Sequence, residues 1–268
     1  MKKNSNSAGE IIIRPIGFVK SDLAYRYETP RQGILSGEEI SIIELLSNNN
    51  FEQAVSKLDG FERIWIIYQF HLNKNWKPLV NPPRHTTKKV GVFASRAPYR
   101  PNQIGISCVK LIKVEGLKIY FSQSDILDGS PVLDIKPYLP YSDSFPEAAT
   151  GWAKNNCDEK YNVEFSFLAA KQTSWLKETA NINLTNFARL QLEFYPTDVS
   201  RKRITDNKDN FALAYRTWRI VFEVNEKIRK VIVQYIHSGY TELELDSAED
   251  KYLDKALHRE FNSRFPVY

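Results

Sequence analysis

Glycine is sparse in this sequence of 268 residues, and its spacing excludes a common fold. Eleven glycines occur and no two lie closer than four residues apart, so the G-x-G-x-x-G fingerprint of dinucleotide-binding folds is absent. The Walker A, H-E-x-x-H and G-x-S-x-G motifs are missing too. No metal-ligand spacing links the four histidines, which are His71, His85, His237 and His258. Phosphate-cradling loops, zinc hydrolysis and serine-hydrolase chemistry therefore have no support, and we expect no metal.

Cysteine and long apolar runs are scarce as well. Only Cys108 and Cys157 occur, which argues against a disulfide framework and for a reducing compartment. No apolar run approaches the roughly eighteen residues that a membrane-spanning helix needs, and none follows the basic start at residues 1–3. We therefore expect a cytoplasmic protein with no membrane segment and a flexible tail over residues 1–10.

The charge balance is mildly basic. Thirty-seven Lys and Arg residues against thirty-two Asp and Glu residues give a net charge of +5 and an isoelectric point near 9.0. This excess favours polyanionic partners such as nucleic acid without requiring one. Hydrophobic residues make up 42% of the chain, which is enough to build the core of one large domain or two modest ones.

Short β-branched and aromatic segments dominate the first half of the chain. They are bounded by Pro, Gly, Asn and Asp, a pattern typical of strands. The clearest are residues 63–71, 89–96, 105–114 and 118–122, and Glu115-Gly116 predicts a hairpin between the last two. One short helix is expected at residues 51–58. Many strands with few helices predict a single-sheet β-barrel over residues 11–155, because closure removes exposed edges.

The residue pattern of the sequence changes after Pro146, and we place a domain boundary near residue 155. Residues 156–268 predict a smaller α+β domain, with a helix at 183–194 and strands at 214–224 and 228–236. Ser247 with Asp250 resembles a capping box for a closing helix. The apolar stripe expected on that helix consists of Leu253, Ala256, Leu257 and Phe261.

Two arginines flank a proline just after one predicted strand. Arg96 and Arg100 lie on either side of Pro98, and Pro101-Asn102 follows, so the segment must be a stiff loop. Guanidiniums held on such a loop suit a bidentate grip on a carboxylate or phosphate. The alternative is a loop tied down by salt bridges to acidic residues.

Three aspartates lie within ten residues of one another. Asp125, Asp128 and Asp134 could bind a hydroxyl or a cation, since a carboxylate can accept hydrogen bonds from both hydroxyls of a ribose. Alternatively, Asp128-Gly129 is only a turn and Asp134 pairs with Lys136 on the same strand face.

A cation and aromatic side chains follow the third aspartate. Lys136 and Tyr138 lie among prolines that prevent regular strand pairing, and together they could form a base-stacking platform or a solvated connection. Further along, basic clusters at residues 201–203 and 227–230 are either solvated faces or phosphate contacts.

Two motifs make this chain resemble a known family. Residues 93–105 read F-A-S-R-A-P-Y-R-P-N-Q-I-G and residues 125–138 read D-I-L-D-G-S-P-V-L-D-I-K-P-Y. Both resemble the signature of the TrmO (TsaA-like) tRNA methyltransferases, as do the shorter pieces at residues 29–33, 58–65 and 80–84. The chain departs from the family at Ala97, where Ser is more usual, and at Gln103, where Pro is common.

The resemblance implies S-adenosylmethionine as the cofactor and names the residues beside it. They are Pro30, Arg31, Gln32, His71, Leu72, Arg96, Ile106, Asp125, Ile126, Leu127 and Asp128. The expected substrate or tRNA contacts are Arg100, Asn102, Lys136, Tyr138, Arg201, Lys202 and Arg203. No catalytic residue can be assigned, and the candidates are Asp134, Lys136 and Tyr138.

The resemblance also implies an activity and an assembly. We expect N6 methylation of N6-threonylcarbamoyladenosine, 3′ of the anticodon of a tRNA, by a homodimer that completes each active site. The alternatives are a noncatalytic RNA-binding barrel and an S-adenosylmethionine enzyme with a non-RNA acceptor. The D-x-x-D-G segment argues against the RNA-binding barrel, because carboxylates repel phosphates.

Overall fold

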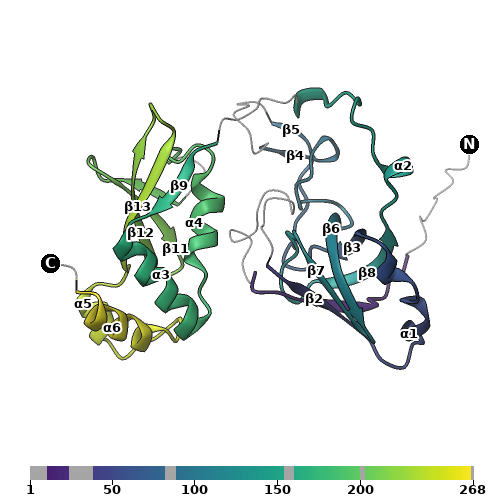
Figure 1. Ribbon diagram of the computed structural model, residues 1–268, viewed down its shortest axis with the longest axis horizontal. Coiled ribbons are helices and arrows are strands. Elements are labelled where there is room, and N and C mark those ends of the chain that lie inside the picture. Colours follow the sequence, from purple (N-terminus) through teal and green to yellow (C-terminus); the bar gives the residue numbers. More distant parts are fainter. Residues whose placement is uncertain (1–10, 24–38, 82–88, 154–159, 200–202, 267–268) are drawn as a thin grey trace, which may run out of the picture. The chain divides into compact units, whose positions relative to one another are not determined.

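The structure is a computed structural model of the full chain, and it describes residues 11–23, 39–81, 89–153, 160–199 and 203–266. The chain divides into two compact units, Met1–Glu147 and Ala148–Tyr268 (Figure 1). The predicted boundary near residue 155 and the predicted tail at residues 1–10 lie outside the described residues. No helix among the described residues is long and apolar enough to cross a membrane.

The first unit is a closed six-stranded barrel, so the predicted fold class is confirmed. Its strands follow the order β1-β2-β7-β6-β3-β8 around the barrel and every neighbouring pair is antiparallel. They are β1 (Gly17–Lys20), β2 (Ser41–Leu45), β3 (Arg63–Gln69), β6 (Ile104–Glu115), β7 (Lys118–Ser122) and β8 (Pro131–Pro137). The predicted hairpin at Glu115-Gly116 joins β6 to β7, with Gly116 at φ 57°.

Strict alternation along β3 separates the inside of the barrel from the outside. Ile64, Ile66 and Tyr68 are buried, whereas Trp65 and Ile67 face outward. Successive side chains of a strand point to opposite faces, so residues paired across neighbouring strands share a face. Full burial of a side chain such as Ile64 stabilises the fold by roughly 1.5–3 kcal/mol. The barrel interior is therefore the core that positions everything attached to its ends.

Two predictions for the first unit were wrong in extent. Only Val90–Gly91 of the predicted strand at residues 89–96 is a strand (β5, paired with β4 at Leu79–Val80), and Val92–Ala94 is a 3-10 helix, η3. Beyond it, the carbonyls of Ser95 and Ala97 accept hydrogen bonds from Arg100 of the same loop. The predicted helix at 51–58 starts as predicted but ends early, as α1 (Phe51–Ala54), and Lys57 takes a positive φ of 66° that a helix cannot accommodate. Turns and the 3-10 helix η2 (Leu58–Gly60) follow, and two further short helices, α2 (Pro140–Asp143) and η4 (Gly151–Ala153), come after β8.

The second unit is a five-stranded sheet with helices, as expected of an α+β fold (Figure 1). The strand order is β10-β11-β12-β13-β9, and only the β13–β9 pair is parallel. The strands are β9 (Asn162–Phe165), β10 (Ile204–Asp206), β11 (Phe211–Tyr215), β12 (Trp218–Asn225) and β13 (Lys230–Ser238). The helices are α3 (Phe167–Ala180), α4 (Leu184–Leu192), α5 (Glu242–Asp246) and α6 (Lys255–Arg264). Both α3 and α6 contact β13.

The predicted helix at residues 183–194 corresponds to α4, whose N-cap is Asn183. The predicted strand at 214–224 is interrupted, since Arg216 takes a positive φ of 50° and turns β11 into β12. The predicted strand at 228–236 begins two residues later, as β13. The longest helix of the unit, α3, was not predicted.

The predicted capping box at Ser247 and Asp250 is wrong. Thr241 and Glu244 form the box instead, at the start of α5, and Ser247 ends that helix. Asp250 nevertheless caps α6, since its carboxylate accepts hydrogen bonds from the amides of residues 254 and 255.

The predicted apolar stripe on α6 is only partly present, since Phe261 is buried and Leu257 half-buried but Ala256 is exposed. Leu253 is 89% exposed, while Lys255, His258 and Phe261 are buried. The ammonium of Lys255 binds the carbonyl and hydroxyl of Ser247, at 3.0 and 2.7 Å, and the carbonyl of Glu244. Polar partners at the end of α5 therefore decide which face of α6 is buried.

Candidate functional site

The segment between β7 and β8 carries both aspartates of the second motif. It is held on the end of β1, since the amide of Gly129 donates to the carbonyl of Val19 at 2.8 Å and that of Asp128 donates to Leu23 at 2.9 Å. Gly129 has a φ of 70°, which a residue with a side chain rarely adopts. The positive φ of Gly129 thus allows the turn that places the carboxylates of Asp125 and Asp128 at the end of β1.

Asp125 is half-buried beside the barrel interior. The Ser107 hydroxyl donates to Asp125 Oδ1 at 2.6 Å. Burial raises the pKa of Asp125, while Ser107, the aspartate's own amide and the charge of Arg96 act in the opposite direction. These hydrogen bonds use two of the roughly four lone-pair sites of a carboxylate. Asp125 can therefore accept further hydrogen bonds from a ligand.

Tyr68 lies behind Ser107 in the barrel. Its hydroxyl oxygen is 3.4 Å from Ser107 Oγ. Burial, and then the negative charge of Asp125, raises the pKa of Tyr68 far above its ordinary value. Both effects keep the phenol protonated.

Asp128 is anchored on one side only. Its Oδ1 accepts a hydrogen bond from the amide of Ser21 at 3.1 Å. Among the described residues, no hydrogen bond to its Oδ2 is present. Asp125 and Asp128 thus each present a carboxylate that is fixed by the protein and has acceptor capacity left.

His71 lies against the same turn. Its Nδ1 is 3.3 Å from the Ser130 hydroxyl, and its Nε2 is 3.9 Å from where a β-carbon on Gly129 would lie. The neighbouring Leu72 is 43% exposed. The structure therefore brings together Asp125, Asp128 and His71, with Arg96 close enough to influence Asp125 electrostatically.

Ile126 lies between the two aspartates and has a different environment. Its side chain is fully buried in the barrel core. Its amide donates to Ser124 Oγ at 3.0 Å and its carbonyl accepts from Ser21 Oγ at 3.3 Å. These contacts make Ile126 an anchor of the segment.

Arg100 makes contacts that were not predicted. Its Nη1 donates to the carbonyls of Ser95 at 2.9 Å, Val92 at 3.3 Å and Ala97 at 3.4 Å. Within the described residues, the hydrogen bonds from Arg100 to these carbonyls brace the loop, and no salt bridge to it is present. One nitrogen of the Arg100 fork is committed to this brace, whereas the side chain of Arg96 is exposed.

The catalytic candidates face away from Asp125. Asp134 pairs with Ile67 across the strands and Lys136 pairs with Trp65, which places both on the outer face of the barrel. Lys136 Nζ lies 2.9 Å from Asp134 Oδ2, the ion pair that the alternative interpretation expects. Ile106, predicted beside the cofactor, is 60% exposed on the same face.

An aromatic pair extends this outer face. The rings of Trp65 and Tyr138 lie 5.9 Å apart, and Trp65 Nε1 donates to Asp143 Oδ2 at 3.0 Å. An amide hydrogen bond from Leu139 and the bond from Trp65 lower the pKa of Asp143. A half-buried aromatic pair beside Lys136 has the composition of a base-stacking surface.

Sequence reasoning missed Ser107, Tyr68 and Ser21. A signal for two of them was present, because the inward positions of β3 and β6 include Tyr68 and Ser107, and a polar residue facing into a barrel needs a partner. The partner itself, Asp125, could not be read from strand periodicity.

Several predicted contacts cannot be placed. Pro30, Arg31, Gln32, Arg201 and Lys202 lie outside the described residues. Within the second basic cluster, Lys230 Nζ is 2.8 Å from Glu164 Oε2 and the Arg229 guanidinium lies 5.8 Å from the centre of the Tyr161 ring. These two cations therefore already have local partners.

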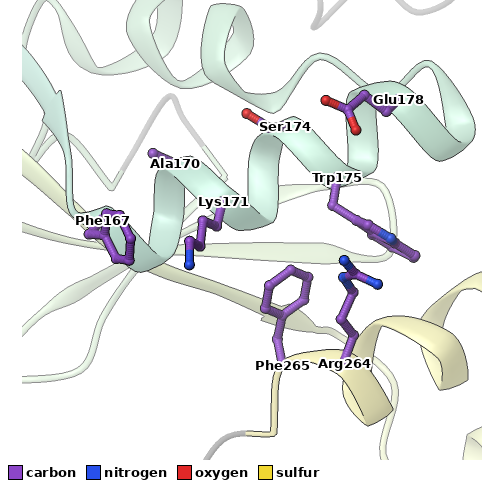
Figure 2. A pocket seen from close by; sticks show the side chains of 8 residues that line it. All are labelled: Phe167, Ala170, Lys171, Ser174, Trp175, Glu178, Arg264 and Phe265. Atoms are coloured by element: carbon purple, nitrogen blue, oxygen red, sulfur yellow. The ribbon is translucent and has the colours of Figure 1, made fainter.

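The second unit has a surface hollow of about 620 Å³ between α3 and the end of α6 (Figure 2). Phe167, Lys171 and Trp175 line it from α3, and Arg264 and Phe265 from α6. The Lys171 ammonium lies 4.3 Å from the centre of the Phe167 ring. No predicted cofactor residue lines this hollow. Among the described residues, no group of three or more His, Cys, Asp or Glu could hold a metal ion.

Comparison with known proteins identifies similar chains. Residues 18–144 match the family model described as the tRNA-methyltransferase O N-terminal domain. The chain is 33% identical to the tRNA (adenine(37)-N6)-methyltransferase of Escherichia coli over 220 residues, covering 80% of this chain and 91% of that protein. It is 42% identical to the mouse protein of the same name over 141 residues, or 51% of this chain. That match spans only 33% of the mouse protein's length.

A solved structure has a similar fold. The crystal structure of TrmO from Pseudomonas aeruginosa matches with a TM-score of 0.64 and 26% identity. The match covers 87% of this chain and all of the Pseudomonas chain. The similarity thus extends beyond the barrel into the second unit.

Proposed function

The chain belongs to the TrmO family, and from that premise we propose that it is an S-adenosylmethionine-dependent tRNA (adenine-N6)-methyltransferase. The observation that carries the proposal is the grouping of Asp125, Asp128 and His71 at the end of a barrel, with both carboxylates fixed and able to accept more hydrogen bonds. The near full-length similarity to the Escherichia coli methyltransferase supports the same activity.

The donor set fits the adenosine part of this cofactor. Asp125 and Asp128 would accept hydrogen bonds from ribose hydroxyls, with His71, Leu72 and Leu127 beside them. When bound, the cofactor supplies an electrophilic methyl group on a sulfonium. The contribution of the protein is then to hold the acceptor nitrogen in line with that methyl group and to exclude water. Pro30, Arg31, Gln32, Arg96 and Ile106 complete the proposed cofactor contacts, and Ile126, buried in the barrel core, holds the segment between the two aspartates in place.

The acceptor is proposed to meet the outer face of the barrel. Tyr138 with Trp65 offers a stacking surface, and Lys136 a cation for a phosphate. Asp134, Lys136 and Tyr138 stay the candidates for proton transfer. The ion pair between Asp134 and Lys136 occupies both side chains, so a tRNA phosphate that binds Lys136 would compete with Asp134 for it.

The proposed substrate is N6-threonylcarbamoyladenosine 3′ of the anticodon. Its threonyl carboxylate would pair with Arg96 and with the Arg100 nitrogens that are not used in the loop, and Asn102 lies on the same loop. A site built for a charged partner rejects analogues that lack it, because its own charges are left desolvated and unpaired. Assembly as a homodimer and a cytoplasmic location stay predictions.

Methyl transfer tests this proposal directly. Labelled S-adenosylmethionine should label tRNA that carries the threonylcarbamoyl group and leave the same transcript unlabelled without it. Equal labelling would refute carboxylate recognition. If the chain binds the cofactor but labels neither tRNA, the acceptor is a different molecule.

The Arg100→Lys variant separates two roles of this arginine. Lysine keeps the charge and loses the planar fork, so the preference for modified tRNA should fall. A rate that falls equally on both tRNAs would show that Arg100 only braces its loop. Arg14→Lys, at an exposed position before β1, is the matched control and should change neither rate nor preference.

A further inference from the structure

Ser107 is the one buried hydroxyl that joins the barrel interior to Asp125 within the described residues. It is 8% exposed and lies on the inward face of β6, between Gly105 and Val109. None of the sequence motifs assigns a function to it.

The hydrogen-bond chemistry of Ser107 has a direction. A hydroxyl has one proton, and at 2.6 Å that proton is given to Asp125. The Tyr68 oxygen lies 3.4 Å from Ser107 Oγ, too far to compete with Asp125 for that proton. Tyr68 therefore supports the serine by contact, and Ser107 is the donor to the carboxylate.

Packing holds this chain of groups in place. A β-carbon on Gly105 would lie 2.7 Å from the Tyr68 ring and 2.8 Å from the Phe70 ring, so both rings lie directly over the glycine. The two rings meet edge to face at 5.3 Å. Tyr68 therefore has little freedom, and neither has the serine that it faces.

We propose that Ser107, supported by Tyr68, is a positioning residue that keeps Asp125 ionised and directs its remaining acceptor sites toward a hydroxyl group of the cofactor. This inference rests on the proposed function. A donor at 2.6 Å stabilises the carboxylate against the cost of burial. It also stops the carboxylate from rotating, so the entropy of ordering is lost on folding and not on ligand binding.

The charged and titratable groups at the Asp125 site are Arg96, Tyr68, Asp128 and His71, and all four remain in the Ser107 variants. Arg96 stabilises its ionised form, and Tyr68 is the titratable group behind Ser107. Without the serine donor, the protonated carboxyl becomes more favourable, and a protonated carboxyl has lost an acceptor. Affinity for the cofactor should then fall as pH decreases, at a higher pH than in the parent chain.

The experiment is calorimetric titration of S-adenosylmethionine into the full chain across a series of pH values. Ser107→Ala should weaken affinity by roughly 10- to 100-fold, the range for a hydrogen bond to a charged group. It should also move the midpoint of the affinity-against-pH curve upward by about one pH unit. Ser107→Thr keeps the hydroxyl and should restore both.

Ser122→Ala is the matched control. Ser122 is 1% exposed in the adjacent strand, and its hydroxyl has no hydrogen-bond partner among the residues that the structure describes. The same chemical change there should leave the affinity and the pH curve unaltered. If Ser107→Ala does not fold, Ser107→Cys, which is similar in size and a weak donor, should give an intermediate shift.

The outcomes separate the two proposals. A parent chain that does not bind the cofactor would refute the proposed function. A parent chain that binds, with a Ser107→Ala variant of equal affinity and an unshifted pH curve, would overturn the positioning role alone. Weaker binding without a pH shift would also overturn it, because a loss of packing changes affinity and not the titration of Asp125.

Discussion

His258 should make the stability of the second unit depend on pH. It is fully buried on α6, its ring stacks on Trp218 at 3.7 Å, and its Nε2 lies 2.9 Å from the Thr217 hydroxyl. Burial lowers its pKa from 6.5 to about 4, against the opposing charge of Asp254. Its Nδ1 is buried without a partner, so a second proton there would gain no hydrogen bond.

The sign and size of the effect follow from this shift. Above about pH 6.5 the histidine is neutral in both the folded and the unfolded chain, so its protonation does not change the free energy of unfolding. As pH falls, the unfolded chain takes up the proton first, so stability decreases until the folded pKa of about 4 is passed. A folded pKa near 4 corresponds to a loss of about 2 kcal/mol between pH 7 and pH 5, and about 3 kcal/mol by pH 4.

Urea unfolding of the full chain at several pH values measures this loss, with His258→Gln as the comparison. Other groups titrate in both proteins, so the difference between their unfolding free energies isolates the histidine. Asp254, Asp250 and Arg219 also act on His258, and all three remain in the variant. A difference that stays constant between pH 7 and pH 4 would refute the account.

Two further predictions concern the barrel and the basic cluster. Gly105→Ala should destabilise the chain by about 1–3 kcal/mol, because the added methyl group overlaps the Tyr68 and Phe70 rings. Gly60→Ala, which has open space around it, is the control and should leave the stability nearly unchanged. Thermal unfolding of both variants and the parent chain measures the difference. Neutralising residues 201–203 together should lower the magnitude of the log–log salt slope of tRNA affinity by about 2–3, if they contact phosphates; an unchanged slope would identify them as a solvated face.

Local pattern was sufficient for the barrel class and for β3, β6 and β7, whereas β1, β2 and β8 were not predicted as strands. The alternation in residues 63–69 and the turn at Glu115-Gly116 predict strands and a hairpin, and both are present. The D-x-x-D-G motif predicts the turn at Gly129. These features depend on neighbours within a few residues, so short-range sequence contains the information.

Side-chain partners over long distances could not be predicted. Arg100 was expected to face a ligand, but one of its nitrogens binds three carbonyls of its own loop. The apolar stripe of α6 was misplaced because buried Lys255 and His258 find polar partners elsewhere in the fold. Hydrophobic periodicity assumes that buried faces are apolar, and it fails wherever a polar group is satisfied by distant contacts.

The candidate site depends on both levels of information. The sequence alone determined the identity and order of Asp125, Asp128 and His71, and the strands that carry their neighbours. Only the tertiary structure decided that β3 lies between β6 and β8, which places Ser107 and Tyr68 inside the barrel next to Asp125 and leaves Ile106, Asp134 and Lys136 outside. The physical reason is that periodicity states which residues of a strand share a face, whereas strand pairing between distant segments determines what that face encloses.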